Sequence, residues 1–209
     1  MSANANIRIL VVNSQPLDRL GLGTFFESQP GMSVVAQAAT GEQGVKLSRT
    51  VAPDIVVMDL RLPGISGVAA MQAIRAQCPR TRFVVLTTYD GDDDIHRALG
   101  AGARAYLIKG MPLESLADAV RKVHAGLRVL PPVVEESLAA WTPNSDLTSR
   151  ERDVLSLIVE GKTNKMIGKD LHITEGTVKC HVNVILRRLA VSCRSEAAIT
   201  ALRRGIVHL

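Results

Sequence analysis

The stretch Thr174-Glu-Gly-Thr-Val-Lys-Cys-His-Val-Asn-Val-Ile-Leu-Arg-Arg-Leu189 has the periodicity of a single amphipathic helix. At about 100° per residue, its apolar positions fall on one narrow stripe and its polar positions on a different arc. The stripe consists of Val178, Val182, Ile185 and Leu189, and the arc carries Lys179, Cys180, Asn183 and Arg187. The pattern therefore predicts a helix with one buried face and one presented face.

A shorter helix is predicted directly upstream, over Thr163-Asn-Lys-Met-Ile-Gly-Lys-Asp-Leu171. Only His172 and Ile173 separate it from Thr174, a residue type that caps helices. Two helices joined so tightly form a helix-turn-helix, whose second helix fits the major groove of DNA. The alternative is a helical hairpin that packs only for its own core.

Positive charge is concentrated in this part of the chain. Residues 161–209 hold 9 Lys/Arg against 3 Asp/Glu, whereas residues 1–145 hold 14 against 13. Such a patch suits contacts to phosphates, which supply most of the non-specific affinity for DNA and make it salt-dependent. A basic helix surface can equally be only a solvated face, so charge by itself does not decide the function.

The first half of the chain alternates short apolar runs with amphipathic helix patterns, which is typical of a parallel sheet with helices on both faces. Five strands are predicted, at Ile7–Val12, Ser33–Ala38, Ile55–Asp59, Arg82–Thr87 and Ala105–Ile108. Helices are expected near 16–28, 41–50, 67–76, 92–100 and 112–125. The order fits a flavodoxin-like α/β fold, in which sites form at the carboxyl ends of the strands. This rule predicts that Asn13, Asp59, Thr87 and Lys109 are neighbours.

Composition narrows the class of protein further. The 209 residues allow one or two domains, and 46% apolar residues are ample for folded cores. The N-terminal residues lack the pattern of a signal peptide, and no apolar run approaches the roughly 18 residues of a membrane span, so a cytoplasmic chain is expected. Cys78, Cys180 and Cys193 have no spacing typical of disulfides or zinc sites, and reduced thiols are expected.

Three motifs in the second half resemble the DNA-binding domain of LuxR/NarL-class bacterial transcription regulators. They are Leu147-Thr-Ser-Arg-Glu-Arg-Asp-Val-Leu155, Glu160-Gly-Lys-Thr-Asn-Lys-Met-Ile-Gly168 and Thr174-Glu-Gly-Thr-Val-Lys-Cys-His-Val182. Physically, Thr148 and Glu151 form a capping-box pattern, and Gly161 stands where the first helix should stop. The resemblance implies a module of four helices over roughly residues 145–209.

This resemblance also implies specific contacts. Its DNA-binding positions correspond to Thr163, Asn164, Lys165, Thr177, Lys179, Cys180, Asn183 and Arg187. Chemically, lysine suits guanine, asparagine suits adenine, and a small soft side chain such as that of Cys180 suits the thymine methyl group. In the family the last helix joins two DNA-binding domains, which implies a homodimer on an inverted repeat through Ala198, Ile199 and Leu202. The alternative is that these three residues pack into the core of their own domain.

A second resemblance covers about residues 5–125. The segments Val57-Met-Asp-Leu-Arg-Leu-Pro-Gly64, Val84-Val-Leu-Thr-Thr-Tyr-Asp90 and Gly102-Ala-Arg-Ala-Tyr-Leu-Ile-Lys109 resemble the receiver domain of two-component response regulators. The likeness implies that Asp59 accepts a phosphoryl group, often from a sensor histidine kinase. Thr87 and Lys109 would contact that group, since a carboxylate nucleophile needs nearby stabilisation of the phosphoryl oxygens. Tyr106 matches an aromatic switch position, although a lone tyrosine there can simply pack against a helix.

One departure from the receiver pattern changes the expected chemistry. Receivers carry two adjacent acidic residues after the first strand to hold Mg²⁺, and this chain has Asn13 and Ser14 there. Magnesium prefers oxygen ligands that include carboxylates, so this degenerate metal pocket leaves at most weak Mg²⁺ binding at Asp59 and predicts no other cofactor. Without those neighbours, Asp59 is expected to pair with Lys109.

The sequence therefore predicts a two-domain, DNA-binding transcription regulator and not an enzyme. Residues 1–125 form the receiver-like domain, 126–145 a partly structured linker with a short helix near 133–141, and 146–209 the helix-turn-helix domain. A receiver independent of phosphorylation, serving as a dimerisation or partner-binding module, is favoured over a conventional phospho-activated regulator. An enzyme of flavodoxin-like fold would need a phosphate loop or an activated nucleophile. A pure interaction adaptor would not need the basic residues of 161–209.

Overall fold

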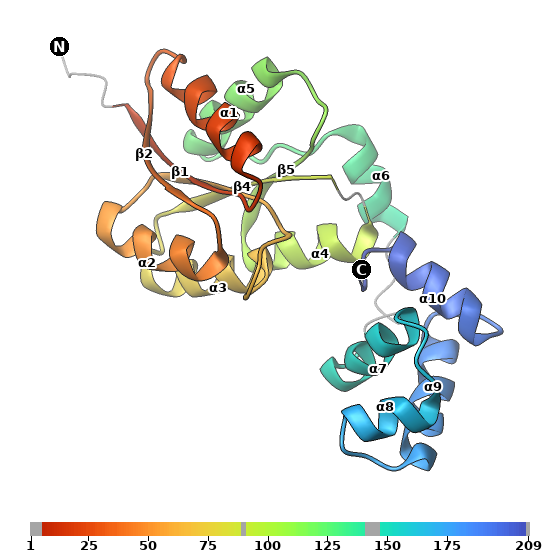
Figure 1. Cartoon of the computed structure of the whole chain (residues 1–209). Helices are drawn as coiled ribbons and strands as arrows, with labels where there is room; N and C mark the ends of the chain where they lie inside the picture. Colours follow the sequence, from red (N-terminus) through yellow and green to blue (C-terminus); the bar gives the residue numbers. More distant parts are fainter. Residues whose placement is uncertain (1–5, 89–90, 141–146, 208–209) are drawn as a thin grey trace. The chain divides into compact units, whose positions relative to one another are not determined.

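A computed structural model describes residues 6–88, 91–140 and 147–207 of the chain. The chain folds into two compact units, here called the N-terminal unit, mostly residues up to Glu136, and the C-terminal unit, mostly residues from Ser137 onward. Within the described residues, no helix is long and apolar enough to cross a lipid bilayer. The expected division into an α/β part and an all-helical part is confirmed (Figure 1).

The N-terminal unit is built on five parallel strands in the order β2-β1-β3-β4-β5. These strands are β1 (Ile7–Val12), β2 (Met32–Ala38), β3 (Ile55–Met58), β4 (Arg82–Thr87) and β5 (Ala103–Ile108). They alternate with α1 (Pro16–Glu27), α2 (Gly41–Val51), α3 (Gly67–Gln77), α4 (Asp92–Ala101) and α5 (Leu113–His124). Helices α1 and α5 cover one face of the sheet, and α2 and α3 cover the other (Figure 1). Because both faces are covered, the central strands are continuous apolar runs rather than alternating ones.

The strand boundaries agree with the sequence except at three ends. β2 begins one residue early, at Met32, and β5 begins two residues early, at Ala103, because Ala103 already pairs with Phe83 of β4. β3 ends at Met58, so Asp59 is the first residue beyond the strand. Parallel pairing places the carboxyl ends of the strands at one edge of the sheet, and their amino ends at the other.

The predicted linker segment contains ordered structure. Val129 pairs with Ala105 of β5 in an isolated parallel bridge, and α6 (Pro132–Ala140) is the short helix expected near 133–141. Trp141, which we expected to anchor the linker, lies outside the described residues, as does the rest of 141–146.

The C-terminal unit consists of four helices around a small apolar core. They are α7 (Ser149–Val159), α8 (Asn164–Asp170), α9 (Glu175–Arg188) and α10 (Arg194–Arg203). α7 starts with the predicted capping box between Thr148 and Glu151. It ends at Val159, and Gly161, with a φ of +80°, permits the hydrogen bonds that close its last turn. The predicted stripe of α9 faces the core, with Val178, Ile185 and Leu189 buried and Val182 partly buried.

The turn between α8 and α9 depends on a close approach of two backbone segments. His172 takes a left-handed conformation with φ of +54°, and the Ile173 N–H donates to Gly168 O at 2.9 Å. A Cβ added to Gly168 would lie 2.8 Å from Ile173 O. Glycine at 168 therefore lets the chain turn within the four residues 171–174 and sets the angle between α8 and α9.

Gly168→Ala is expected to lower the free energy of unfolding of the C-terminal unit by about 1–3 kcal/mol, because the new methyl group meets a backbone oxygen. Gly176→Ala is the matched control, since its Cβ would meet only Thr174 Oγ1 at 3.7 Å and alanine favours helices. Urea denaturation followed by circular dichroism measures both. Equal stability of the two variants would contradict the tight turn.

Candidate functional site

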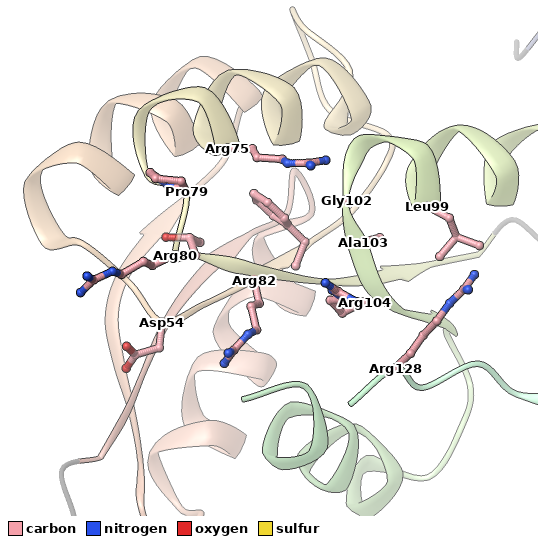
Figure 2. A pocket seen from close by; sticks show the side chains of 12 residues that line it. Asp54, Arg75, Pro79, Arg80, Arg82, Leu99, Gly102, Ala103, Arg104 and Arg128 are labelled. Carbon is pink, nitrogen blue, oxygen red and sulfur yellow. The ribbon is translucent and has the colours of Figure 1, made fainter. Parts of the chain in front are cut away.

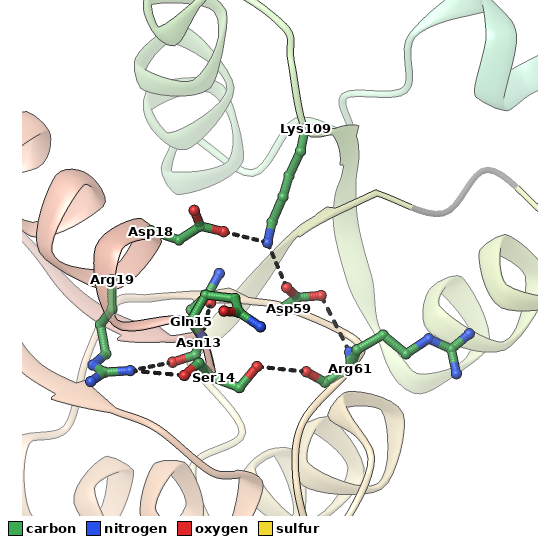
Figure 3. Close-up of polar contacts among 8 residues, drawn as sticks. All are labelled: Asn13, Ser14, Gln15, Asp18, Arg19, Asp59, Arg61 and Lys109. Atoms are coloured by element: carbon green, nitrogen blue, oxygen red, sulfur yellow. Dashed lines mark hydrogen bonds and ion pairs between the residues drawn. The ribbon is translucent and has the colours of Figure 1, made fainter. Parts of the chain in front are cut away.

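Asn13, Asp59, Thr87 and Lys109, which the sequence predicts to be neighbours, lie together at the carboxyl edge of the sheet. The Asp59 N–H donates to Val12 O at 2.9 Å, which fixes the end of β3 beside the end of β1. The Lys109 N–H donates to Thr87 O at 2.7 Å, which fixes the end of β5 beside the end of β4. Backbone hydrogen bonds between adjacent strands therefore position the side chains that follow them. Figure 3 shows three of these residues, Asn13, Asp59 and Lys109.

The Lys109 ammonium group is the centre of this site. Its Nζ lies 2.8 Å from Asp59 Oδ2 and 2.7 Å from Asp18 Oδ2. Burial alone lowers the pKa of Lys109, but the hydrogen bonds and negative charges of Asp18 and Asp59 outweigh it, and the pKa lies above its ordinary value. Lys109 is therefore a cation held between two anions, and the expected pair with Asp59 is confirmed.

Asp18 was missed as a site residue. It lies in the first turn of α1, where a carboxylate is favourable next to the positive end of a helix. Because this already explains an aspartate there, the sequence does not indicate a second role. One signal was available, because α1 begins at the carboxyl edge of the sheet, only three residues after Asn13. Whether the Asp18 side chain reaches Lys109, 91 residues away in sequence, depends on how α1 packs.

Asn13 and Ser14 take part in local hydrogen bonds. Asn13 is almost fully buried, and its Oδ1 accepts from the Gln15 N–H at 2.8 Å. The Ser14 hydroxyl donates to Arg61 O at 3.3 Å, and the Arg61 N–H donates to Asp59 Oδ1 at 3.2 Å. This network connects the loop after β1 to the loop after β3 through neutral groups (Figure 3).

A second cation lies beside the loop after β1. Arg19 of α1 donates from Nη1 to Asn13 O at 2.7 Å and to Ser14 O at 3.4 Å. The guanidinium group thus holds the two carbonyl oxygens of the loop in a fixed position. Sequence reasoning did not single out Arg19, because its role depends on backbone atoms that no sequence pattern identifies.

Thr87 and Tyr106 are both fully buried at β4 and β5. No hydrogen-bond partner of Thr87 Oγ1 lies within the described part of the chain. We expected Thr87 to contact a phosphoryl group on Asp59, and this stays a prediction; without that group, the Thr87 hydroxyl makes no hydrogen bond to Asp59. The Tyr106 ring lies in the interior, as an aromatic residue packed inside the unit would.

On the C-terminal unit, the predicted DNA contacts form an exposed surface of α8 and α9. Thr163, Lys165, Thr177, Lys179, Cys180, Asn183 and Arg187 are exposed, and Asn164 is half-buried. Thr163 and Thr174 cap their helices, with side chains that accept from the N–H groups of Met166 and Thr177. The apolar stripe thus faces inward and the polar arc outward, as the periodicity predicts.

Arg194, at the start of α10, was not predicted to be a site residue. It stabilises the predicted DNA-contact surface through hydrogen bonds inside the unit. Its guanidinium group donates to Asn164 Oδ1 at 2.9 Å and to Lys162 O. Burial lowers the pKa of Arg194 below its ordinary value. Asn164 therefore has a structural partner inside the unit, a role that the resemblance alone did not predict.

The three predicted dimerisation residues differ in exposure. Ile199 is 63% exposed and Leu202 is 38% exposed, whereas Ala198 packs partly against the core of the unit. The alternative that all three belong to the core therefore fails for the two larger side chains. The opposite face of α10 supplies that core through Ala197 and Ala201.

Comparisons with known proteins agree with this two-part structure. Residues 9–121 match the family described as response regulator receiver domain, and residues 145–201 match the luxR family of bacterial regulatory proteins. The transcriptional regulatory protein LiaR of Bacillus subtilis (strain 168) is 36% identical over 97% of this chain and 100% of its own length. The nitrate/nitrite response regulator NarL of Escherichia coli (strain K12) is 36% identical, over 95% of this chain and 96% of its own.

Solved structures show the same fold. The response regulator ChrA of a heme-sensing two-component system is 33% identical, with a TM-score of 0.57 over 97% of this chain and 99% of its own. RcsB in a DNA complex is 18% identical, with a TM-score of 0.66 over 95% of this chain and 98% of its own, a likeness of fold alone. This chain belongs to the two-component response regulators of the LuxR/NarL class, DNA-binding transcription regulators and not enzymes, with a receiver domain followed by a luxR-family helix-turn-helix domain.

Proposed function

We propose that the receiver domain of this transcription regulator works without phosphorylation of Asp59. The observation that carries the proposal is the position of Lys109 Nζ, 2.8 Å from Asp59 and 2.7 Å from Asp18. In a receiver that depends on phosphorylation, the phosphoryl group supplies the anion that recruits this lysine. Here two side chains of the protein already supply that anion, so the switch region has one stable arrangement without a ligand.

The residues around Asp59 fit Mg²⁺ poorly. The metal prefers octahedral oxygen ligands that include carboxylates. Asn13 Oδ1 already accepts from a backbone N–H, and Ser14 donates to the carbonyl oxygen of Arg61. Both nearby carboxylates, Asp18 and Asp59, are paired with Lys109, and no group of three or more metal-ligating side chains occurs among the described residues.

Asp18 adds a steric and electrostatic argument. It reaches from α1 across the opening of the site to Lys109, and its side chain is 43% exposed. A phosphodonor dianion approaching Asp59 would meet a second negative charge there, without a metal ion to neutralise it. We therefore infer that the receiver serves as a standing dimerisation or partner-binding module. We also propose that the protein is cytoplasmic and that its domain boundaries lie near residues 125 and 146.

The conventional function, acceptance of a phosphoryl group at Asp59 from a sensor kinase, is favoured by one observation. Thr87 Oγ1 is buried without a hydrogen-bond partner among the described residues, next to the edge where Asp59 lies. A buried hydroxyl without a partner costs free energy, and a phosphoryl oxygen would satisfy it. The two functions make opposite predictions for the phosphorylation experiment below.

We propose that α9 reads the DNA sequence with Lys179, Cys180 and Asn183. All three side chains are exposed on the arc opposite the buried stripe. Lys179 forms only an exposed ion pair with Glu175 at 3.2 Å, and such pairs are weak enough to exchange for a base or phosphate. The remaining predicted contacts, from Thr163 to Arg187, are proposed to position the protein on the DNA backbone.

We also propose that α10 forms the two-fold contact of a homodimer on an inverted repeat. Ile199 and Leu202 are large apolar side chains exposed on one helix, three positions apart, and Ala198 lies beside them. A small apolar surface on a helix can be buried in a symmetric contact with the same surface of a second copy. An inverted repeat in the DNA would align the two copies, and the contact between them would make their binding cooperative.

Incubation with acetyl phosphate and millimolar Mg²⁺ is expected to leave little acyl phosphate on the wild-type chain, measured by intact-protein mass spectrometry. A triple variant, Asn13→Asp with Ser14→Asp and Asp18→Asn, should gain both Mg²⁺ affinity and phosphorylation. Two carboxylates are restored at positions 13 and 14, and Lys109 is released from Asp18. Asp118→Asn, on the surface of α5, is the control for Asp18→Asn. Near-complete, metal-dependent phosphorylation of the wild-type chain would establish the conventional function instead.

Asn183→Ala is expected to relax sequence preference at one base-pair position by about 1–3 kcal/mol, because a bidentate contact to adenine is lost. Binding to a library of duplex sites, sequenced before and after selection, measures this. Lys169→Ala, an exposed change on α8 outside the proposed reading set, should leave the preference unchanged. A uniform loss of affinity for all sequences would make Asn183 a backbone contact.

Ile199→Asp is expected to abolish cooperative binding to an inverted repeat while leaving affinity for a single half-site nearly unchanged. The new carboxylates would face each other across the two-fold axis. Ser195→Asp adds the same charge to an exposed position of the same helix and should keep the cooperativity. Analytical ultracentrifugation on labelled DNA gives the stoichiometry, and two copies of Ile199→Asp bound cooperatively would remove the claim.

A further inference from the structure

A cavity of about 680 Å³ opens on the receiver domain, at the edge of the sheet where β4 and β5 begin. Because the strands are parallel, this is the edge opposite Asp59, so the cavity is separate from the site described above. Five arginines line it, with a single acidic residue, Asp54. The arginines are Arg75, Arg80, Arg82, Arg104 and Arg128 (Figure 2).

The arginines come from four different parts of the domain. Arg75 lies in the last turn of α3, Arg80 lies in the turn before β4, and Arg82 is the first residue of β4. Arg104 is on β5, and Arg128 follows α5. In Figure 2 the side chains of Arg75, Arg104 and Arg128 lie on the side of the cavity toward α4. The side chains of Arg80 and Arg82 extend away from α4. The fold thus brings three guanidinium groups from distant parts of the sequence to one concave surface.

These positive charges are not compensated by acidic side chains. No ion pair to any of the five arginines occurs within residues 6–88, 91–140 and 147–207. Arg75 and Arg82 donate only to backbone carbonyl oxygens, those of Ala101 and His124. The carboxylate of Asp54 accepts from the Arg8 N–H at 2.9 Å. Since arginine stays protonated, the cavity keeps a net positive charge at any physiological pH.

We propose that this cavity binds a small molecule that carries two or more phosphoryl groups, such as a nucleoside polyphosphate or inorganic tripolyphosphate. Guanidinium groups bind phosphate oxygens through paired, charge-assisted hydrogen bonds. Several arginines from separate elements suit several linked phosphates better than a single one. The volume lies within the range of ligand pockets, and Pro79 and Leu99 offer apolar surface for a non-phosphate part.

The charge is local rather than general, which argues for a site and against a merely basic domain. Residues 1–145 carry 14 Lys/Arg against 13 Asp/Glu, so five arginines beside one aspartate represent a strong concentration at this edge. The surface is also concave, which suits a small polyanion that can enter it more than a duplex lying across it. Duplex DNA is therefore a competing outcome of the test.

A bound polyphosphate would also touch the start of the linker. Val129 is hydrogen bonded to β5, with its N–H donating to Arg104 O at 2.9 Å, and Tyr106 donates from its N–H to Val129 O at 3.3 Å. Arg104 and Arg128 therefore stand on two segments that pair with each other. A ligand that bridges them would stabilise this pairing, and with it the first residues after α5.

Isothermal titration of the full-length chain with tripolyphosphate, ATP and orthophosphate tests the proposal. Arg104→Gln with Arg128→Gln should weaken tripolyphosphate binding by at least about tenfold, because charged hydrogen bonds are lost. Arg49→Gln with Arg121→Gln is the matched control, since it removes the same charge from exposed helix positions outside the cavity, and should keep the wild-type affinity. NMR shifts of the Gly102 and Ala103 amides on adding tripolyphosphate locate the ligand.

Binding of tripolyphosphate or ATP at these amides, lost only in the cavity variant, would support the proposal, and tighter binding of ATP would assign a role to the nucleoside. An equal loss in both variants would show a response to total charge and would overturn it. Shifts confined to α8 and α9, or orthophosphate binding as tightly as tripolyphosphate, would also overturn it. Displacement of tripolyphosphate from Gly102 by a short duplex of unrelated sequence would assign the cavity to DNA instead.

Discussion

The ammonium group of Lys109 is the point on which the arrangement of the receiver site depends. It joins the end of β5 to the end of β3 through Asp59 and to α1 through Asp18. In a partly buried site, this cation stabilises both carboxylates, so removal of Lys109 would leave two unpaired negative charges, whereas removal of either carboxylate would leave one ion pair. Asn13 and Ser14 are neutral, so they add no further carboxylate that would compete for this lysine.

The neutral network beside Lys109 has a matching role. Asn13, Ser14 and Arg61 use their polar atoms on one another and on the backbone, and Arg19 holds the loop carbonyls. Polar groups in a buried site must be paired, and here they pair with other groups of the protein. Thr87 is an exception, because its buried hydroxyl has no hydrogen-bond partner among the described residues.

In the C-terminal domain, the residues that build the core are separate from those that form the exposed surface of α9. Its core combines the apolar stripe of α9 with residues of α7, α8 and α10, which leaves the polar arc of α9 exposed. The tight turn at Gly168 and His172 fixes the angle between α8 and α9, so the exposed side chains of both helices present one surface. Arg194 holds Asn164 of that surface in place through a hydrogen bond from within the unit.

The sequence by itself determined the order of strands and helices, the capping box at Thr148, and the inward stripe and outward arc of α9, because each depends on residues close together in the chain. It also determined that Asn13, Asp59, Thr87 and Lys109 meet, because parallel strands end at one edge. Only the tertiary structure decided that Asp18 shares Lys109, that the Thr87 hydroxyl has no hydrogen-bond partner among the described residues, and that Arg75, Arg104 and Arg128 line one cavity. Those contacts depend on how helices pack on the sheet and which way long side chains extend, and no local pattern in the chain encodes either.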